Sequence, residues 1–402
     1  MGKPKIRFEG YSEDWEQRKL GDNIVEYTEK TTENNQYPVL TSSRKGIFFQ
    51  TDYYDGNQIA SADNTGYNIV PYGFFTYRHM SDDEIFHFNI NDIAENGIVS
   101  TLYPVFTTDE NLDSRYLQYQ LNYGREFARY AILQKQGGSR TYMYLNKLRN
   151  LYLTVPTAIE EQKKISEYFT NLDHLITLHQ RKYDETKTLK KYMLQKMFPQ
   201  NGEKVPEIRF DGFTEDWEQR KLDDVLKRRI EQRQQSEEYP RLAFASGQGV
   251  IPLSERKTNN REQLTKDEYT KKYLVTELND IVYNPANVKY GAIDRNKCGR
   301  GVISPIYVTF TTNEVPGFIE RIVTSHDFQQ RALRFEEGTV TKRQSVNPED
   351  LVTLDILVAP KREEQQKIAT YFDALDHLIT LHQRKCNELK EIKKYMLQNM
   401  FV

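Results

Sequence analysis

Two long stretches of the chain carry apolar residues at alternating spacings of four and three, the pattern of a helix that packs along a partner helix. A proline precedes each stretch, and the letters EEQ at each start favour a helix N-terminus. The apolar positions are Ile165, Phe169, Leu172, Ile176, His179, Tyr183, Met193 and Met197, and then Ile368, Phe372, Leu375, Ile379, His382, Cys386, Leu389, Met396 and Met400. Lys190 and Lys393 interrupt them. The pattern predicts two helices, each about 58 Å long, that pack on each other in antiparallel orientation.

The two stretches belong to a tandem repeat. Residues 5–20 and 207–222 agree at 12 of 16 positions, and residues 160–198 and 363–401 agree at 28 of 39 positions. The two offsets, 202 and 203, differ by one residue. The segments between these blocks align only in fragments: 101–110 resembles 304–314, and 69–78 is placed opposite 281–290. The repeat therefore predicts two copies of one fold with two different surfaces.

The divergent segments have a mixed pattern. Short β-branched and aromatic runs such as GIFFQT and DIVYN alternate with turn residues. A helical stretch follows in each, around 113–133 and 325–336, and Gly-containing loops at 134–145 and 335–346 precede the closing strands. These features predict two tandem mixed α/β (α+β) domains, separated by two long helices that form an antiparallel intramolecular coiled coil. The expected boundaries of domain, helix, domain and helix are 1–158, 159–200, 201–361 and 362–402.

Composition narrows the class of protein. The chain has 402 residues, of which 38% are hydrophobic and 28% are charged, and its net charge is -2. It contains no apolar run of the ~18 residues that span a membrane, and two cysteines are too few for a disulfide framework. We expect a cytoplasmic protein. The first divergent segment carries a net charge of -5 and the second +2. We therefore expect this chain alone to bind nucleic acid weakly and partner proteins to supply much of the electrostatic attraction.

No arrangement of residues predicts catalysis. Phosphate-binding loops and dinucleotide fingerprints are missing from the sequence. NPAN at 284–287 resembles a methyltransferase motif but lacks its second proline and its aromatic residue, so a turn is favoured. The helix histidines are spaced by five residues, which favours packing over metal binding. The repeated carboxylates near Trp15 and Trp217 favour capping, and both tryptophans are expected to anchor against the helices.

The divergent loops are better suited to recognition, because Arg and Lys suit guanine, Asn and Gln suit adenine, and Ser or Thr suits bases or phosphates. Ordinary solvated loops remain an alternative for each residue. The candidates in the first copy are Thr41, Ser42, Ser43, Arg44, Lys45, Tyr77, Arg78, Ser139, Arg140, Thr141 and Tyr142. Those in the second copy are Ser246, Gln248, Asn287, Lys289, Tyr290, Lys342, Arg343 and Gln344.

Three repeated motifs resemble a known family. IRFEGYSEDWEQRKL and IRFDGFTEDWEQRKL, the helix EEQxKIxxYFxxLDxLITLHQRK and the tail KKYMLQxMF are similar to the specificity (S) subunit of type I restriction–modification systems. The resemblance covers the whole chain in the family's order of motif, target recognition domain and helix, repeated once. It implies that Phe169, Leu172, Ile176, Phe372, Leu375 and Ile379 build the helix pair, and that Trp15, Arg18, Trp217 and Arg220 support its junctions.

The resemblance also implies a function. S subunits are not enzymes: each target recognition domain reads one half of an asymmetric bipartite site in double-stranded DNA, and the helix pair fixes the spacer. They bind two modification subunits, which methylate adenine with S-adenosylmethionine, and restriction subunits add ATP- and magnesium-dependent cleavage. Such cofactors belong to the partner subunits, and this chain is expected to hold none.

Two other functions compete with this one. The weak net charge suits a structural coiled-coil adaptor whose variable domains bind proteins rather than DNA. A self-contained restriction–methyltransferase is a third possibility, against which the missing catalytic motifs argue.

Overall fold

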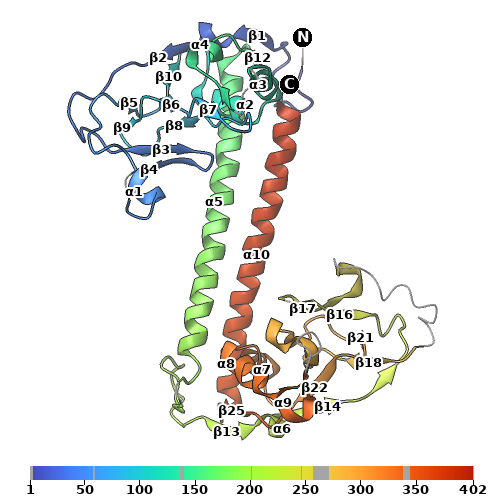
Figure 1. Cartoon of the computed structure of the whole chain (residues 1–402). Coiled ribbons are helices and arrows are strands. Elements are labelled where there is room, and N and C mark those ends of the chain that lie inside the picture. Colours follow the sequence, from blue (N-terminus) through green and yellow to red (C-terminus); the bar gives the residue numbers. More distant parts are fainter. Residues whose placement is uncertain are drawn as a thin grey trace. The chain divides into compact units, whose positions relative to one another are not determined.

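The computed structural model describes residues 3–57, 59–135, 140–200, 202–245, 247–256, 271–337 and 345–401 (Figure 1). The chain divides into two units. Unit 1 consists of Met1–Gln180 and Gln383–Val402, and unit 2 consists of Arg181–His382. Each unit therefore contains a divergent segment together with one end of each long helix.

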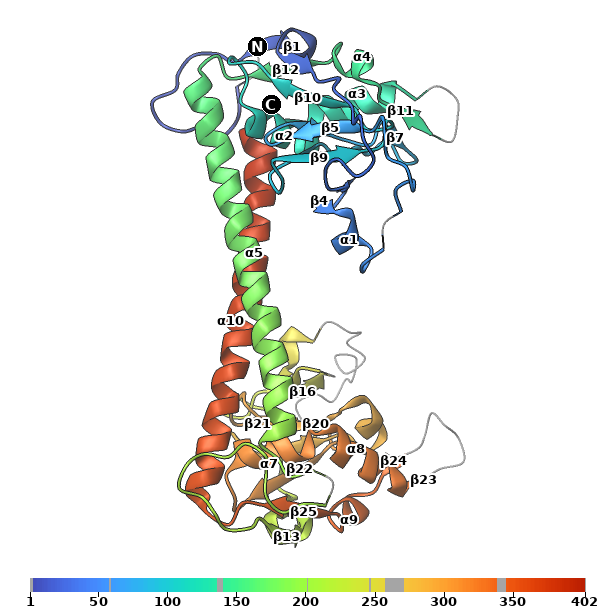
Figure 2. The same ribbon diagram turned by 90° about the vertical axis from the view of Figure 1, so that its left-hand side faces the viewer.

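The predicted long helices are α5 (Ile159–Lys196) and α10 (Arg362–Met400). Inside unit 1, the first turns of α5 pack against the last turns of α10, where Ile165, Phe169 and Leu172 share a core with Leu389 and Met400 (Figures 1 and 2). In unit 2 the reverse ends meet, and Met193, Leu194 and Met197 share a core with Ile368 and Phe372. The helices run antiparallel within each unit, which confirms the predicted intramolecular coiled coil.

The polar interruptions of the apolar stripe have partners on the facing helix. In unit 1 Lys393 of α10 forms an ion pair with Asp173 of α5, with its Nζ 2.5 Å from Oδ1. In unit 2 Lys190 of α5 pairs in the same way with Asp376 of α10. These pairs hold one register of the antiparallel helices, because a shifted register would leave a partly buried lysine without its carboxylate.

The central sheet of unit 1 is antiparallel, in the order β2-β10-β6-β8. Its strands are β2 (Ile24–Glu26), β10 (Val105–Thr108), β6 (Phe75–Thr76) and β8 (Asn89–Ile90). Smaller antiparallel pairs are β1 (Glu16–Lys19) with β12 (Tyr152–Val155), β3 (Leu40–Ser43) with β4 (Gly46–Phe49), β5 (Asn68–Pro71) with β9 (Asn96–Val99), and β7 (Met80–Ser81) with β11 (Thr141–Tyr142). The helices are the 3₁₀ helix η1 (Leu20–Asp22), α1 (Gln50–Tyr53), α2 (Ser114–Tyr123), α3 (Arg125–Leu133) and α4 (Leu145–Leu148).

Unit 2 repeats the central sheet in the order β14-β22-β19-β20. Its strands are β14 (Leu226–Arg229), β22 (Val308–Thr312), β19 (Ile281–Tyr283) and β20 (Ile293–Arg295). The other strands are β13 (Glu218–Lys221) with β25 (Asp355–Val358), β15 (Gln232–Arg233) with β18 (Tyr273–Thr276) and β21 (Gly301–Ile303), β16 (Leu242–Ala245) with β17 (Gly249–Pro252), and β23 (Glu336–Glu337) with β24 (Ser345–Val346). The helices are α6 (Leu222–Val225), α7 (Pro316–Val323), α8 (His326–Ala332) and α9 (Pro348–Leu351), with 3₁₀ helices η2 (Leu253–Glu255), η4 (Pro285–Tyr290) and η5 (Leu333–Phe335).

Strand register corrects one predicted alignment. Phe75 lies opposite Phe106 in unit 1, and Ile281 lies opposite Phe310 in unit 2. Since FTTDE at 106–110 matches FTTNE at 310–314, Tyr77 is the counterpart of Tyr283. The sequence alignment of 69–78 with 281–290 was wrong by six residues, because Ile69 and Val70 belong to β5, which pairs with β9 outside the central sheet. The shared residue pair Ile-Val in the two segments had suggested this incorrect alignment.

Helix prediction succeeded in unit 1 and was incomplete in unit 2. The stretch around 113–133 contains α2 and α3, and the stretch around 325–336 contains α8. The predicted stretch began too late to include α7, whose sequence PGFIERIV opens with Pro-Gly and is rich in β-branched residues. Nearly all of α7 is buried, so packing decides its conformation rather than intrinsic preference.

Candidate nucleic-acid interface

A buried tyrosine pins the loop before the closing strand in both units. The Tyr77 hydroxyl donates a hydrogen bond to the Met143 carbonyl at 2.9 Å, and the Tyr283 hydroxyl donates to the Val346 carbonyl at 3.3 Å. Both rings are fully buried, and burial raises the pKa of both hydroxyls, so each remains a hydrogen-bond donor at neutral pH. Tyr77 directly follows the central strand β6 and Tyr283 is the last residue of the central strand β19, so each tyrosine ties the loop to the sheet.

In unit 1 this arrangement brings together three predicted segments that are far apart in the sequence. The β3–β4 turn, the residues after β6 and the start of β11 surround a cavity of about 250 Å³ or border it. The cavity is lined by residues that include Ser43, Arg44, Arg78, Met80, Asp82 and His87.

Aspartates hold two of the arginines at this surface. Arg140 donates to Asp82 at 2.9 Å, and Arg44 pairs with Asp83. The hydrogen bond from Arg44 holds the pKa of Asp83 well below its usual value. Arg44, Arg78 and Arg140 are exposed, and Arg44 and Arg140 can exchange their carboxylate partners for a phosphate or a base edge.

Three predicted contact residues of unit 1 face inward. Tyr77 is part of the core, Ser42 donates to the Thr76 carbonyl, and the Thr141 side chain is buried. Their burial argues against direct contact with DNA in the fold described here, most strongly for Tyr77 and Thr141, whereas Ser42 is 7% exposed and lines the cavity. Among the remaining candidates, Lys45 and Tyr142 are exposed, Thr41 and Ser43 are half-buried, and Ser139 lies outside the described residues.

In unit 2 the described candidates lie on two elements. Gln248 is exposed in the β16–β17 turn, whereas Asn287, Lys289 and Tyr290 lie on η4, with Asn287 and Tyr290 exposed. NPAN forms the start of η4, where the Asn284 side chain accepts from the Ala286 amide at 3.1 Å, so the turn interpretation is confirmed. Ser246, Lys342, Arg343 and Gln344 lie outside the described residues.

A triad that the sequence did not reveal joins each N-terminal segment to a long helix. Glu161 at the start of α5 is fully buried and accepts two bonds from Arg7, at 2.6 and 2.8 Å, while the Trp15 indole donates at 3.4 Å. Unit 2 repeats this geometry with Arg209, Glu364 and Trp217, at 2.7, 2.8 and 3.4 Å. The tryptophans do anchor against the helices, but they share a buried bidentate ion pair.

The glutamine that follows each buried glutamate completes the junction. Gln162 accepts from the Asp113 amide at 2.9 Å and donates to the Pro156 carbonyl at 3.0 Å. Gln365 makes the same two contacts with the Val315 amide and the Ala359 carbonyl, at 3.0 and 2.8 Å. The letters EEQ thus connect the helix to the domain core. The repetition of the IRF and EEQ motifs in both copies was the sequence signal for these junction contacts. The preference of a helix N-terminus for negative charge explains only part of that repetition.

The other predicted scaffold residues lie along the helices and their junctions. Phe169, Leu172, Phe372 and Leu375 are buried, and Ile176 and Ile379 are half-buried. Arg18 donates to the Asn111 and Thr157 carbonyls at 2.8 and 3.4 Å, next to the start of α5. Arg220 pairs with Glu314 at 2.7 Å, and Glu314 in turn accepts from Gln365.

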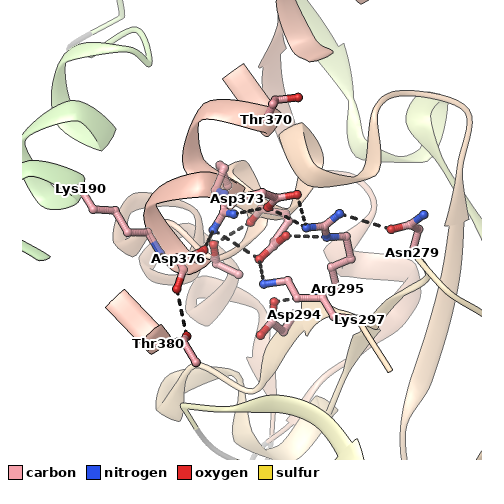
Figure 3. A network of polar contacts seen from close by, with 12 residues as sticks. Lys190, Asn279, Asp294, Arg295, Lys297, Thr370, Asp373, Asp376 and Thr380 are labelled. Carbon is pink, nitrogen blue, oxygen red and sulfur yellow. Dashed lines mark hydrogen bonds and ion pairs between the residues drawn. The ribbon is translucent and has the colours of Figure 1, made fainter. Parts of the chain in front are cut away.

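Unit 2 carries an ionic network where its domain meets the helix pair (Figure 3). Arg295 of β20 donates to Glu320 at 2.6 Å and to Asp373 of α10 at 2.7 and 2.8 Å. The buried Arg321 of α7 reaches both Asp373 and Asp376, each through one nitrogen, at 2.7 and 2.8 Å. In unit 1 the counterpart of Arg321 is Tyr119, whose hydroxyl donates to Asp173 at 2.8 Å. The two units therefore attach to the helices by different chemistry.

The network makes stability depend on pH through Asp294. Burial and the neighbouring Glu320 carboxylate raise the pKa of Asp294 to about 6. An unfolded aspartate titrates near pH 4, so between about pH 4 and 6 the folded chain keeps a proton that the unfolded chain has released. Stability therefore falls as pH rises through this interval.

Asp294→Asn is expected to remove this fall and to be more stable than the native chain by about 1–3 kcal/mol at pH 7–8, with the two curves meeting near pH 4. Denaturant unfolding from pH 4 to 8 measures the difference. Asp211→Asn, at an exposed site, is the control. Parallel pH profiles for the native chain and Asp294→Asn would contradict the assignment.

The described part of the chain shows neither a metal-binding cluster nor a membrane-spanning helix. Its His, Cys, Asp and Glu side chains form no group of three or more that could hold a metal ion. None of its helices is both long and apolar enough to cross a membrane.

Comparison with protein families identifies the fold's relatives. The family model described as "Type I restriction modification DNA specificity domain" matches the chain twice, over residues 12–188 and 214–391. The chain belongs to this family. Membership of the DNA specificity family confirms the predicted role in DNA sequence recognition, and nothing favours the adaptor alternative.

One solved structure supports the same fold, and two others are more distantly similar. The type I restriction–modification S subunit from M. genitalium is 11% identical and has a TM-score of 0.62, with 100% of this chain and 99% of that chain covered. The HsdS subunit from Thermoanaerobacter tengcongensis is 14% identical with a TM-score of 0.42, and 98% of each chain is covered. A third chain comes from a structure on complex assembly and conformational transition of the type I R-M system. It is 14% identical with a TM-score of 0.42, and 96% of this chain and 97% of that chain are covered. No curated protein sequence matches this specificity chain.

Proposed function

We propose that each unit reads one half of an asymmetric bipartite site in double-stranded DNA. The observation that carries this proposal is the pairing of one sheet order with two different surfaces. Unit 1 presents arginines around the cavity at the β3–β4 turn, whereas unit 2 presents Gln248 and the amide and aromatic side chains of η4. Arginine suits guanine and Asn or Gln suits adenine, so the halves should differ in sequence.

The chain acts, in this proposal, with two modification subunits. Apolar side chains are exposed on the helices at repeated positions: Leu175 and Leu378, Leu189 and Ile392, and Tyr192 and Tyr395. Each unit holds one member of every pair. Exposed apolar surface repeated in this way suits two copies of one partner.

The chemistry is assigned to the partners. The modification subunits would supply adenine methylation with S-adenosylmethionine, and two restriction subunits would add ATP- and magnesium-dependent cleavage. The specificity chain itself would be non-catalytic and would act in the cytoplasm. Because its own net charge is only -2, the partners would also supply most phosphate contacts.

Arg140→Ala is expected to relax recognition of one half-site by roughly ten- to a hundredfold and to leave the other unchanged, because one arginine–base pair discriminates by about 1–3 kcal/mol. Methylated-adenine maps of cells carrying each variant measure the effect. Arg129→Ala, an exposed arginine of α3, is the control. Equal relaxation of both half-sites would contradict the proposal.

A DNA-retention assay of this chain with and without its modification subunit tests the contribution of the partners. Loss of retention only when the modification subunit is absent would show that the partners supply most of the affinity for DNA.

The two helices should set the spacer between the half-sites. Inserting the same seven residues after Gln180 and after His382 lengthens each helix by about 10 Å. The spacer is then expected to grow by about three base pairs, at 3.4 Å per pair, with both half-sites preserved. Methylation maps provide the readout, and a seven-residue insertion in α5 alone, which breaks the helix pairing, is the control. An unchanged spacer would contradict the ruler role.

A further inference from the structure

Three aromatic side chains form a stack at the surface of unit 1. The Tyr144 ring lies 4.9 Å from the His79 ring with an angle of 24°, and 5.9 Å from the Tyr142 ring with an angle of 11°. The rings of His79 and Tyr142 are 6.1 Å apart. Such geometry is a stabilising offset stack rather than chance proximity.

The backbone and the buried histidine hold the stack in place. Tyr142 pairs with Met80 between β11 and β7, and the Met143 amide donates to the His79 carbonyl at 2.7 Å. His79 is buried, and its Nδ1 contacts the Leu102 carbonyl. Tyr77 fixes the Met143 carbonyl from the other side. The rings are therefore ordered before any ligand arrives, which lowers the entropy cost of binding.

Two of the three rings remain open to solvent. Tyr142 is 38% exposed and Tyr144 is 48% exposed. The stack lies beside the cavity residues, because Met80 lines the cavity and Arg140 pairs with Asp82, another lining residue. A rigid, exposed apolar surface therefore borders the arginines proposed to contact DNA.

At the matching described positions of unit 2, the stack has no counterpart. Since Tyr77 corresponds to Tyr283, His79 corresponds to Pro285. Since Met143 and Val346 accept the two tyrosine hydroxyls, Tyr142 corresponds to Ser345 and Tyr144 to Asn347. A feature present in one unit suits sequence reading, whereas a general backbone grip or a partner contact would be expected in both.

We infer that the stack of His79, Tyr142 and Tyr144 reads a thymine in the first half-site by contact with its 5-methyl group. This inference rests on the proposed function. Inside a duplex the base faces are covered by their neighbours, and among base edges in the major groove only thymine presents an apolar group. An aromatic ring beside arginines matches that group, and the arginines can contact neighbouring guanines or phosphates.

The test replaces thymine with deoxyuridine, which removes the methyl group and keeps every hydrogen-bonding atom. The complex of this chain with its modification subunit is titrated with duplexes carrying the replacement at each thymine of the half-site assigned to unit 1. One replacement is expected to weaken binding about fourfold, as for one buried methyl-sized group. Tyr144→Ala should bind both duplexes equally, and Tyr144→Phe should keep the native difference. Tyr72→Ala, at another exposed tyrosine of unit 1, should also keep it.

The possible results distinguish failure of the thymine inference from failure of the proposed function of unit 1. If the native complex binds its site specifically but no thymine replacement weakens it, or if that half-site contains no thymine on either strand, the stack does not read a methyl group. A Tyr144→Ala complex that retains the native difference overturns the inference too. If Arg140→Ala and Tyr144→Ala leave both half-sites unchanged, the proposed function of unit 1 itself fails.

Discussion

Glu161→Ala is expected to lower the free energy of unfolding of unit 1 by about 3–5 kcal/mol, the cost of leaving one partner of a buried ion pair alone. Glu161 is fully buried, so its removal strands the Arg7 guanidinium and the Trp15 indole together. The Trp15 indole is buried and the Arg7 side chain is only 14% exposed, so both donors are left largely desolvated unless the junction between the N-terminal segment and α5 opens. Hydrogen exchange of unit 1 amides, compared with those of unit 2, measures the loss.

Glu160→Ala is the matched control, because Glu160 precedes Glu161 on the same helix turn and is exposed. It is expected to change stability by less than about 0.5 kcal/mol. Glu364→Ala and its neighbour Glu363→Ala repeat the comparison in unit 2. A double variant, Arg7→Met with Glu161→Leu, should recover much of the loss, since apolar replacement of a whole buried pair is often neutral. Equal effects of Glu160→Ala and Glu161→Ala would show that the triad is not a stabilising element.

The features predicted well from sequence are those that repeat locally. The stripes of α5 and α10 and the tandem order follow from periodicity and self-similarity, which depend only on nearby residues. Cys386 and Leu389 are buried on the predicted stripe, and Lys393, marked as an interruption, remains on it as a paired charge. The sequence marked the polar break in the apolar stripe but did not predict the ion pair that Lys393 forms across the helices.

Features that depend on distant partners escaped prediction. Glu161 looked like a helix-dipole charge because its partner, Arg7, lies 154 residues away. Tyr77 looked like a surface contact because it precedes Arg78, yet strand alternation turns it into the core and onto Met143. Pairing of β11 with β7 placed Tyr142 beside His79, and no local pattern encodes that contact. Local sequence patterns predict helices and strands, whereas the register of strand pairing determines which distant side chains come into contact.

The candidate interface shows the same division. Loop clusters in the sequence suggested Arg44, Arg78 and Arg140 as DNA contacts, and the fold exposes all three around one region of unit 1. It could not separate them from Ser42 and Thr141, which lie in the same loops and point inward. Their roles in DNA contact stay predictions until half-site mapping is done.

Asp173→Lys is expected to destabilise the helix pairing in unit 1 by about 2–3 kcal/mol, between the values for exposed and buried ion pairs. The change removes the carboxylate that holds Lys393, which is largely buried, and places a second ammonium group beside it. It also removes the acceptor of the Tyr119 hydroxyl. Glu167→Lys, which makes the same charge change at an exposed site of α5, is expected to be nearly neutral.

The reciprocal exchange tests the register directly. Asp173→Lys combined with Lys393→Asp restores opposite charges across the two helices and should recover most of the stability, as measured by a double-mutant cycle on hydrogen exchange of unit 1. The same exchange of Asp376 and Lys190 should recover less in unit 2, because Asp376 also binds the buried Arg321. Burial favours the neutral form of Asp376, yet Arg321 and Lys190 outweigh it and keep its pKa below the usual value. After the exchange, a lysine at this position would still face the buried Arg321. Equal recovery in both units would contradict this account, because it would mean that Arg321 contributes nothing to the pairing of α5 with α10.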